Sequence, residues 1–100
     1  MVKHIVMWRL KQEAHGNSAE HNARLIKEKL EALSGRIRGL LAIDVGLDFS
    51  CTDSSADVVL LSEFTDKAAL EAYQRHPEHQ ALIPFIGGAS SERRVVDYEC

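Results

Sequence analysis

The chain has 100 residues, of which 45% are hydrophobic and 27% are charged, and its net charge is −3. This length suits one domain with a modest core, so we expect residues 1–100 to form a single domain. The composition is that of a folded globular protein and argues against a disordered chain. Basic residues form no stripe along the sequence, which argues against binding to nucleic acid or to an anionic membrane.

The N-terminal segment and the cysteines favour a cytoplasmic protein. The apolar run at the N-terminus is too short for a signal peptide, and no segment approaches the roughly 20 apolar residues of a membrane span. Cys51 and Cys100 are the two cysteines of the chain. We expect both to be free thiols in a reducing compartment.

Apolar periodicity divides the chain into strands and helices. Alternation with a period of two predicts strands over residues 2–10 and 40–49, and a continuous apolar run predicts another over 58–64. A last strand is predicted over 93–99. Helical spacing of apolar residues predicts one helix between Ser18 and Gly35, and a second that begins at Thr65 or Asp66 and ends near residue 75. The connecting segments are predicted to be a hairpin loop at 50–57, a short irregular or helical segment at 78–86, and a flexible turn at 87–91.

The order of these elements, β-α-β-β-α-β, predicts an α+β fold of the ferredoxin-like type. In this βαββαβ fold a four-stranded antiparallel sheet carries its helices on one face. The strands nevertheless have apolar residues on both faces, since Ile5 and Met7 lie opposite the row that holds Val6 and Trp8. We therefore expect a second copy of the chain to cover the face without helices, so that the protein is a homodimer.

The segment Tyr73-Gln-Arg-His76-Pro77-Glu-His79 holds the densest cluster of reactive side chains. Pro77 turns the chain out of the helix between the two histidines, and Tyr73 lies one helical turn earlier on the apolar stripe. A histidine that titrates near neutral pH beside a phenol can form an acid–base pair. The alternative, which is more frequent for such residues in general, is that the His-Pro pair caps a helix and the tyrosine belongs to the core.

His4 and Asp97 are further candidates. His4 shares the face of Val6 and Trp8, where an isolated histidine is usually a hydrogen-bonded core residue. Asp97 alternates with apolar residues on the last strand, and an inward carboxylate there could orient a histidine; otherwise it would serve as an edge or ion-pair residue. Histidines and acidic residues are also metal-ligand types, but no spacing matches a known zinc pattern, so we expect no metal and no other cofactor.

Three segments together resemble one known family. They are the start Val2-Lys-His4-Ile-Val6, the motif Tyr73-x-x-His76-Pro77-x-His79 and the ending Val95-Val-Asp97-Tyr98. They resemble the stress-responsive dimeric α/β-barrel (Dabb) family over essentially the whole chain. The resemblance implies that two ferredoxin-like sheets pair face to face into a dimeric α/β barrel, a stress-response A/B barrel.

The same family includes the plant polyketide cyclase that forms olivetolic acid without a metal or an organic cofactor. By this resemblance Tyr73 and His79 correspond to a catalytic pair, and His4 corresponds to a histidine of the pocket. Arg93 lies near a position that is apolar in the cyclase, so the ligand of this chain is expected to differ.

These features predict a small-molecule pocket for a small apolar or polyketide-like ligand. Its binding residues are expected to be His4, Val6, Trp8, His76 and Asp97. If the chain is an enzyme, we expect a cofactor-independent reaction of the cyclase or lyase type, with His79 as the general base and Tyr73 steadying an enolate. Two other classes stay open: a non-catalytic ligand-binding or stress-protective dimer, and a relative that handles a metal, a flavin or a haem.

Overall fold

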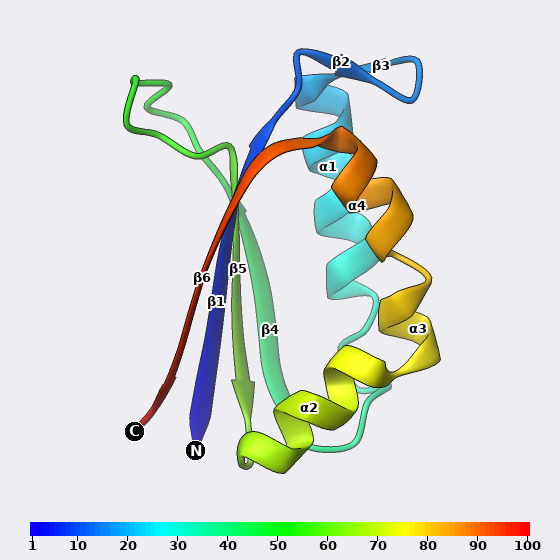
Figure 1. The fold of residues 1–100 in the computed structure, drawn as a ribbon, viewed down its shortest axis with the longest axis vertical. Coiled ribbons are helices and arrows are strands. Elements are labelled where there is room, and N and C mark those ends of the chain that lie inside the picture. The colour runs from blue at the N-terminus through cyan, green and yellow to red at the C-terminus, as the bar shows by residue number, and fades with distance from the viewer.

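A computed structural model describes all 100 residues and has the predicted α+β architecture, with one main sheet and a layer of helices (Figure 1). Four strands form an antiparallel sheet in the order β4-β5-β1-β6. Their bounds are β1 Val2–Leu10, β4 Leu40–Leu47, β5 Val58–Phe64 and β6 Ser90–Glu99. The helices are α1 Ala19–Glu31, α2 Lys67–Arg75, α3 Pro77–Gln80 and α4 Ile83–Ala89, and all four lie on one face of the sheet (Figure 1).

The hydrophobic core lies between this helical layer and the face of the sheet that it covers. Val6 of β1 stands opposite Leu60 of β5 on one side and Val95 of β6 on the other. Because side chains alternate along a strand, the same register sends Ile5 and Met7 to the open face. The core is closed from above by the apolar stripe of α1, in which Ile26 is fully buried.

Both predicted helix starts are confirmed by their caps. The Ser18 Oγ accepts a hydrogen bond from the His21 N–H at 3.2 Å, and α1 begins at the next residue. The Asp66 Oδ1 accepts one from the Ala69 N–H at 2.8 Å at the start of α2. A side-chain oxygen in this position satisfies a backbone N–H that has no partner inside the helix, which is why Ser and Asp mark these boundaries in the sequence.

The flexible turn predicted at 87–91 is wrong, because residues up to Ala89 belong to α4 and β6 begins at once with Ser90. The Ser90 hydroxyl donates a hydrogen bond to the Ile86 carbonyl at 2.6 Å and so closes the last turn of the helix. Gly88 lies so close to His15 that a Cβ atom there would be 2.9 Å from the imidazole. The glycine therefore serves close packing, not chain flexibility.

His15 belongs to a short hairpin that the sequence did not predict, formed by β2 Glu13–Ala14 and β3 Asn17–Ser18. Its imidazole stacks on the Phe85 ring of α4 with the ring centroids 4.5 Å apart, and its Nε2 lies 2.9 Å from the Phe85 carbonyl oxygen. The hairpin thus holds α4 against the start of α1.

The open face of the sheet carries large apolar side chains that no helix covers. Those with more than a third of their surface exposed are Met7, Leu61, Val96 and Tyr98. Cys51 and Cys100 are exposed and are not joined in a disulfide. None of the helices combines the length and the apolar character that a passage across a membrane would need.

We expect Gly39→Ala to destabilise the fold more than Gly35→Ala. Both glycines have left-handed backbone, with φ of +85° and +75°, but only at Gly39 would a Cβ atom collide with a neighbour, 2.6 Å from the Ala69 Cβ of α2. Gly35→Ala should lower the free energy of unfolding by about 1–2 kcal/mol, the typical cost of left-handed backbone. Chemical denaturation of both variants measures the difference, and equal losses would contradict a close approach of α2 to Gly39.

Candidate functional site

A cavity of about 400 Å³ lies between the helical layer and the sheet. Small-molecule sites typically enclose about 300–1,000 Å³, so this one suits a small ligand. Most of its surface is apolar. The floor is formed by His4, Val6 and Trp8 of β1 with Leu60 of β5, the cover by Leu30, His79, Leu82, Ile83, Ile86 and Gly87, and the mouth by Ser90, Ser91, Glu92 and Arg93.

His79 is placed in the cavity by the junction between α2 and α3. Pro77 has no N–H, and the backbone of His76 turns to a ψ of 134°, so the last carbonyls of α2 lose their helical partners. The Gln74 carbonyl accepts instead from the Gln80 side-chain amide at 2.6 Å and from the His79 Nδ1 at 3.3 Å. Because Nδ1 is then the protonated nitrogen, the lone pair of His79 is on Nε2.

The protonation of His79 is shifted by its surroundings. Burial lowers the pKa of its imidazole from the usual 6.5, since desolvation penalises the charged form. The hydrogen bond to Gln74 opposes this shift, while the positive charge of Arg93 adds to it. His79 is therefore neutral at neutral pH and available as a proton acceptor.

Tyr73 lies directly behind His79 and is completely buried. The two ring centroids are 4.4 Å apart at a tilt of 46°, and the Phe64 ring packs on the other side at 5.0 Å. Burial raises the pKa of the Tyr73 phenol to about 12. Its hydroxyl has no hydrogen-bond partner in the protein, and Tyr73 is not among the residues that line the cavity. The pair is thus in ring contact without an O–H···N hydrogen bond.

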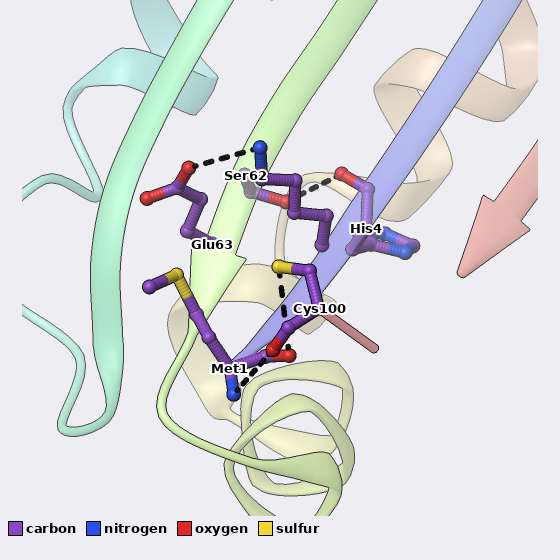
Figure 2. Close-up of polar contacts among 6 residues, drawn as sticks. Met1, His4, Ser62, Glu63 and Cys100 are labelled. Carbon is purple, nitrogen blue, oxygen red and sulfur yellow. Dashed lines mark hydrogen bonds and ion pairs between the residues drawn. The ribbon is translucent and has the colours of Figure 1, made fainter. Parts of the chain in front are cut away.

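His4 lies on the floor of the cavity with only 2% of its surface exposed. Its Nδ1 is hydrogen-bonded to the Asp97 carboxylate across the β1–β6 pair, which places the proton of a neutral imidazole on Nδ1. The Ser62 hydroxyl donates to the His4 carbonyl at 2.9 Å (Figure 2). The His4 and Tyr73 ring centroids are 6.3 Å apart, edge to face.

The structure brings three of the five predicted binding residues to the cavity, namely His4, Val6 and Trp8. Asp97 touches the cavity only through His4. The His76 Nδ1 accepts a hydrogen bond from the Glu78 N–H at 3.1 Å and caps α3, so its imidazole is engaged outside the cavity. No three or more His, Cys, Asp or Glu side chains are grouped closely enough to hold a metal ion.

Several cavity residues were not predicted, and they come from α4 and the start of β6. The helical spacing of Ile83 and Ile86 was the pattern that could have predicted α4. Gly87 and Gly88 have low helical propensity, and the segment that contains them was therefore predicted to be a turn. Arg93 alternates with Val95 and Asp97 on the last strand, so the sequence indicates that these side chains share one face of the sheet. It does not indicate that a cavity lies beside that face.

The split β-α-β arrangement, the antiparallel order of the strands and the one-sided helical layer define a ferredoxin-like α+β domain. The family model of the Stress responsive A/B Barrel Domain (Dabb) matches residues 2–100, and the chain belongs to this family. The resemblance inferred from the three sequence segments is thereby confirmed.

Solved structures agree with this assignment. The chain is similar to a dimeric ferredoxin-like protein of unknown function from Bacteroides fragilis, with 31% identity, a TM-score of 0.86 and coverage of 99% of this chain and 95% of the other. A dimeric ferredoxin-like protein of unknown function from Jannaschia sp. has 28% identity and a TM-score of 0.77, with coverage of 99% and 98%. A hydroxynitrile lyase from Passiflora edulis shares the fold, with 17% identity, a TM-score of 0.80 and coverage of 97% and 90%. A comparison with curated proteins finds no match.

The lowered pKa of His79 predicts a loss of stability in mild acid. The unfolded chain, with the usual histidine pKa of 6.5, binds a proton more readily than the folded protein does. The free energy of unfolding should therefore fall as the pH drops below about 6.5, and this part of the loss should be complete below the folded-state pKa. Denaturation curves of wild type and His79→Gln between pH 5 and 8 isolate the contribution. The difference between the two proteins should shrink in acid, and a constant difference would contradict the prediction.

Proposed function

We propose that this protein is a cofactor-independent acid–base enzyme that acts on a small carbonyl compound in the cavity, by a reaction of the cyclase or lyase type. The observation that carries the proposal is the His79 imidazole: it lines a largely apolar cavity, is held by Gln74 through Nδ1, and has a lowered pKa. A positioned base of this kind typically accelerates a reaction by about 10²–10⁴-fold.

In the proposed reaction the His79 Nε2 removes a proton from the carbon next to the carbonyl group. The two electrons of that C–H bond move into the carbonyl, which becomes an enolate, and the apolar walls exclude water that would otherwise compete for the base. The enolate carbon then forms a C–C bond with a second carbonyl in a cyclisation, and the alkoxide that results takes the proton back from the His79 imidazolium. In a lyase-type reaction His79 removes a hydroxyl proton instead. The alkoxide becomes a carbonyl as the adjacent C–C bond breaks, and the departing carbanion keeps the electron pair of that bond and takes the proton from His79.

Tyr73 has the second role in the proposal, as the hydrogen-bond donor to the developing oxyanion. Because Tyr73 is completely buried and does not line the cavity, this role requires the side chains between its hydroxyl and the cavity to move apart when the substrate binds. The high pKa of Tyr73 keeps the phenol protonated over the whole physiological range, and its hydroxyl has no competing acceptor in the protein. A buried hydroxyl without a partner costs about 1–3 kcal/mol, which a substrate oxygen would recover. The Passiflora edulis hydroxynitrile lyase has the same fold, so the fold is compatible with this class of chemistry.

The proton-abstraction step can be tested without knowing the substrate. The probe 5-nitrobenzisoxazole is an uncharged bicyclic compound that opens to a yellow cyanophenolate when a base removes its C–H proton. Wild type should accelerate this opening, and His79→Gln should lower kcat/KM by about 10²-fold, because the base is lost. The rate should rise with pH below 6.5 and level off near neutrality, since only neutral His79 accepts a proton.

His21→Gln is the matched control for this assay, because His21 is an exposed histidine of α1 outside the cavity. It should leave the rate unchanged. Equal rates for His79→Gln and wild type would refute the role of His79. Binding of the probe in the cavity without any acceleration would favour a ligand-binding protein over an enzyme.

We further propose that the working unit is a homodimer joined through the open face of the sheet. This face exposes Met7, Leu61, Val96 and Tyr98, which is more apolar surface than an isolated antiparallel sheet normally leaves in water. The similar proteins from Bacteroides fragilis and Jannaschia sp. are both described as dimeric. Facing sheets of two copies would form the A/B barrel for which the family is named.

A single charge on the open face should therefore dissociate the dimer. Leu61→Glu and Val96→Glu would each bury a carboxylate between the two sheets, which is costly without a partner. Light scattering at micromolar concentration should give the mass of two chains for wild type and of one chain, or an aggregate, for these variants. Val95→Glu is the control, since Val95 is the neighbour of Val96 on the opposite face and is also partly exposed. A monomeric wild type would contradict the proposal.

A further inference from the structure

The mouth of the cavity carries one permanent charge that no other residue balances. Four ionisable residues line the cavity, namely His4, His79, Glu92 and Arg93. His4 is bonded to Asp97, and the Glu92 carboxylate lies 3.6 Å from the Arg94 guanidinium. Arg93 takes part in none of the ion pairs of the structure. Its guanidinium is therefore available to a ligand.

The direction of the Arg93 side chain follows from the register of the sheet. Arg93 of β6 pairs with Trp8 of β1, so its side chain points to the face of the sheet that the helices cover. Trp8 forms part of the cavity floor on that face. Arg94 pairs with Met7, so its side chain points to the open face of the sheet. Two adjacent arginines of one strand thus lie on opposite faces, and only Arg93 borders the cavity.

The rest of the cavity defines what the arginine would select. Behind the mouth the walls are formed by Val6, Trp8, Leu30, Leu60, Leu82 and Ile86. Such walls favour an apolar body, and a planar guanidinium pairs with a carboxylate through two parallel hydrogen bonds. A single cation at the edge of an apolar space matches one negative charge at the end of an apolar molecule.

We infer that the cavity binds a small amphipathic carboxylate, whose carboxylate group pairs with Arg93 at the mouth while its apolar body extends inward past Trp8 towards His79. This inference deepens the proposed function, because it gives the substrate class of the same site and makes Arg93 a specificity-determining residue. The substrate would then be a carbonyl compound with a terminal carboxylate, such as a keto acid. The positive charge of Arg93 also helps to keep His79 in its neutral, basic form.

Trp8 makes the binding step measurable on its own. It is the single tryptophan of the chain and lines the cavity, so its fluorescence reports a ligand there. Octanoate and 1-octanol both have an unbranched chain of eight carbon atoms, counting the carboxylate carbon of octanoate, and they differ in charge. Wild type should bind octanoate at least about tenfold more tightly than octanol, since a hydrogen-bonded pair with a charged group is worth about one or two powers of ten.

Two variants separate the arginine of the mouth from general surface charge. Arg93→Gln should weaken octanoate binding by about tenfold and leave octanol binding unchanged. Arg38→Gln, at an exposed arginine that lies outside the cavity and takes part in none of the ion pairs, should change neither. The inference is overturned if octanol binds as tightly as octanoate, if both arginine variants weaken octanoate equally, or if neither ligand changes the Trp8 fluorescence up to the solubility of octanol.

Failure of the carboxylate site can be distinguished from failure of the proposed enzyme activity. Octanoate should also inhibit the opening of 5-nitrobenzisoxazole competitively, because both occupy one cavity. If octanoate binds in an Arg93-dependent manner but wild type does not accelerate the opening, the carboxylate site stands and the enzyme proposal falls. If His79-dependent acceleration is present but octanoate shows no preference over octanol, the enzyme proposal stands and the carboxylate site falls.

Discussion

The alternation of side chains along β1 determines what each face of the sheet becomes. The even-numbered side chains His4, Val6 and Trp8 point towards the helices, where they form part of the core and the floor of the cavity. The odd-numbered side chains Ile5 and Met7 point to the open face. A shift of one residue in the pairing with β5 would exchange the two sets and place apolar bulk where the cavity is. The core, the candidate site and the apolar surface offered to a second copy all depend on this one register.

Exclusion of water is the main electrostatic influence within the site. Burial is the largest cause of the lowered pKa of His79 and of the raised pKa of Tyr73. The two shifts have opposite directions but the same result, because in each case the neutral form is favoured. An uncharged acceptor and an uncharged donor thus lie in ring contact beside an apolar cavity, and the one cavity-lining charge without an ion-pair partner, that of Arg93, stays at the mouth.

The features that could be predicted from the sequence are those encoded by local pattern. The strand alternation, the capping residues Ser18 and Asp66 and the turn at Pro77 each depend on a few neighbouring residues, and together with the family resemblance they were enough for the fold. The proximity of the Tyr73, His79 and His4 rings also followed, because the alternation along β1 and the apolar stripe of α2 point to the same space. The pattern did not show that Tyr73 would be buried behind His79 and not in the lining of the cavity.

The remaining features depend on contacts between distant segments. The helix at 83–89 contains two consecutive glycines, which weaken helical propensity, and it is held by His15 from a hairpin about 70 residues earlier in the chain. His76 and His79 look equivalent in the motif, yet one caps α3 and the other enters the cavity, because Pro77 changes the direction of the chain between them. The inferred role of Arg93, to pair with a ligand carboxylate, depends on the cavity between the helices and the sheet. The pattern of residues along the sequence does not reveal such a cavity.

The two ends of the chain lie side by side, because the first strand pairs with the last (Figures 1 and 2). The Cys100 N–H donates to the Met1 carbonyl at 3.0 Å, so the pairing extends to the termini. Pairing of β1 with β6 closes nearly the whole chain into a loop, and contacts between residues so distant in sequence slow folding. A circular permutant that joins the ends by a short turn, and opens the chain in the exposed segment at 50–54, would convert this most distant pairing into a hairpin. The site and the sheet order would be unchanged, but the order in which the strands find one another would be different.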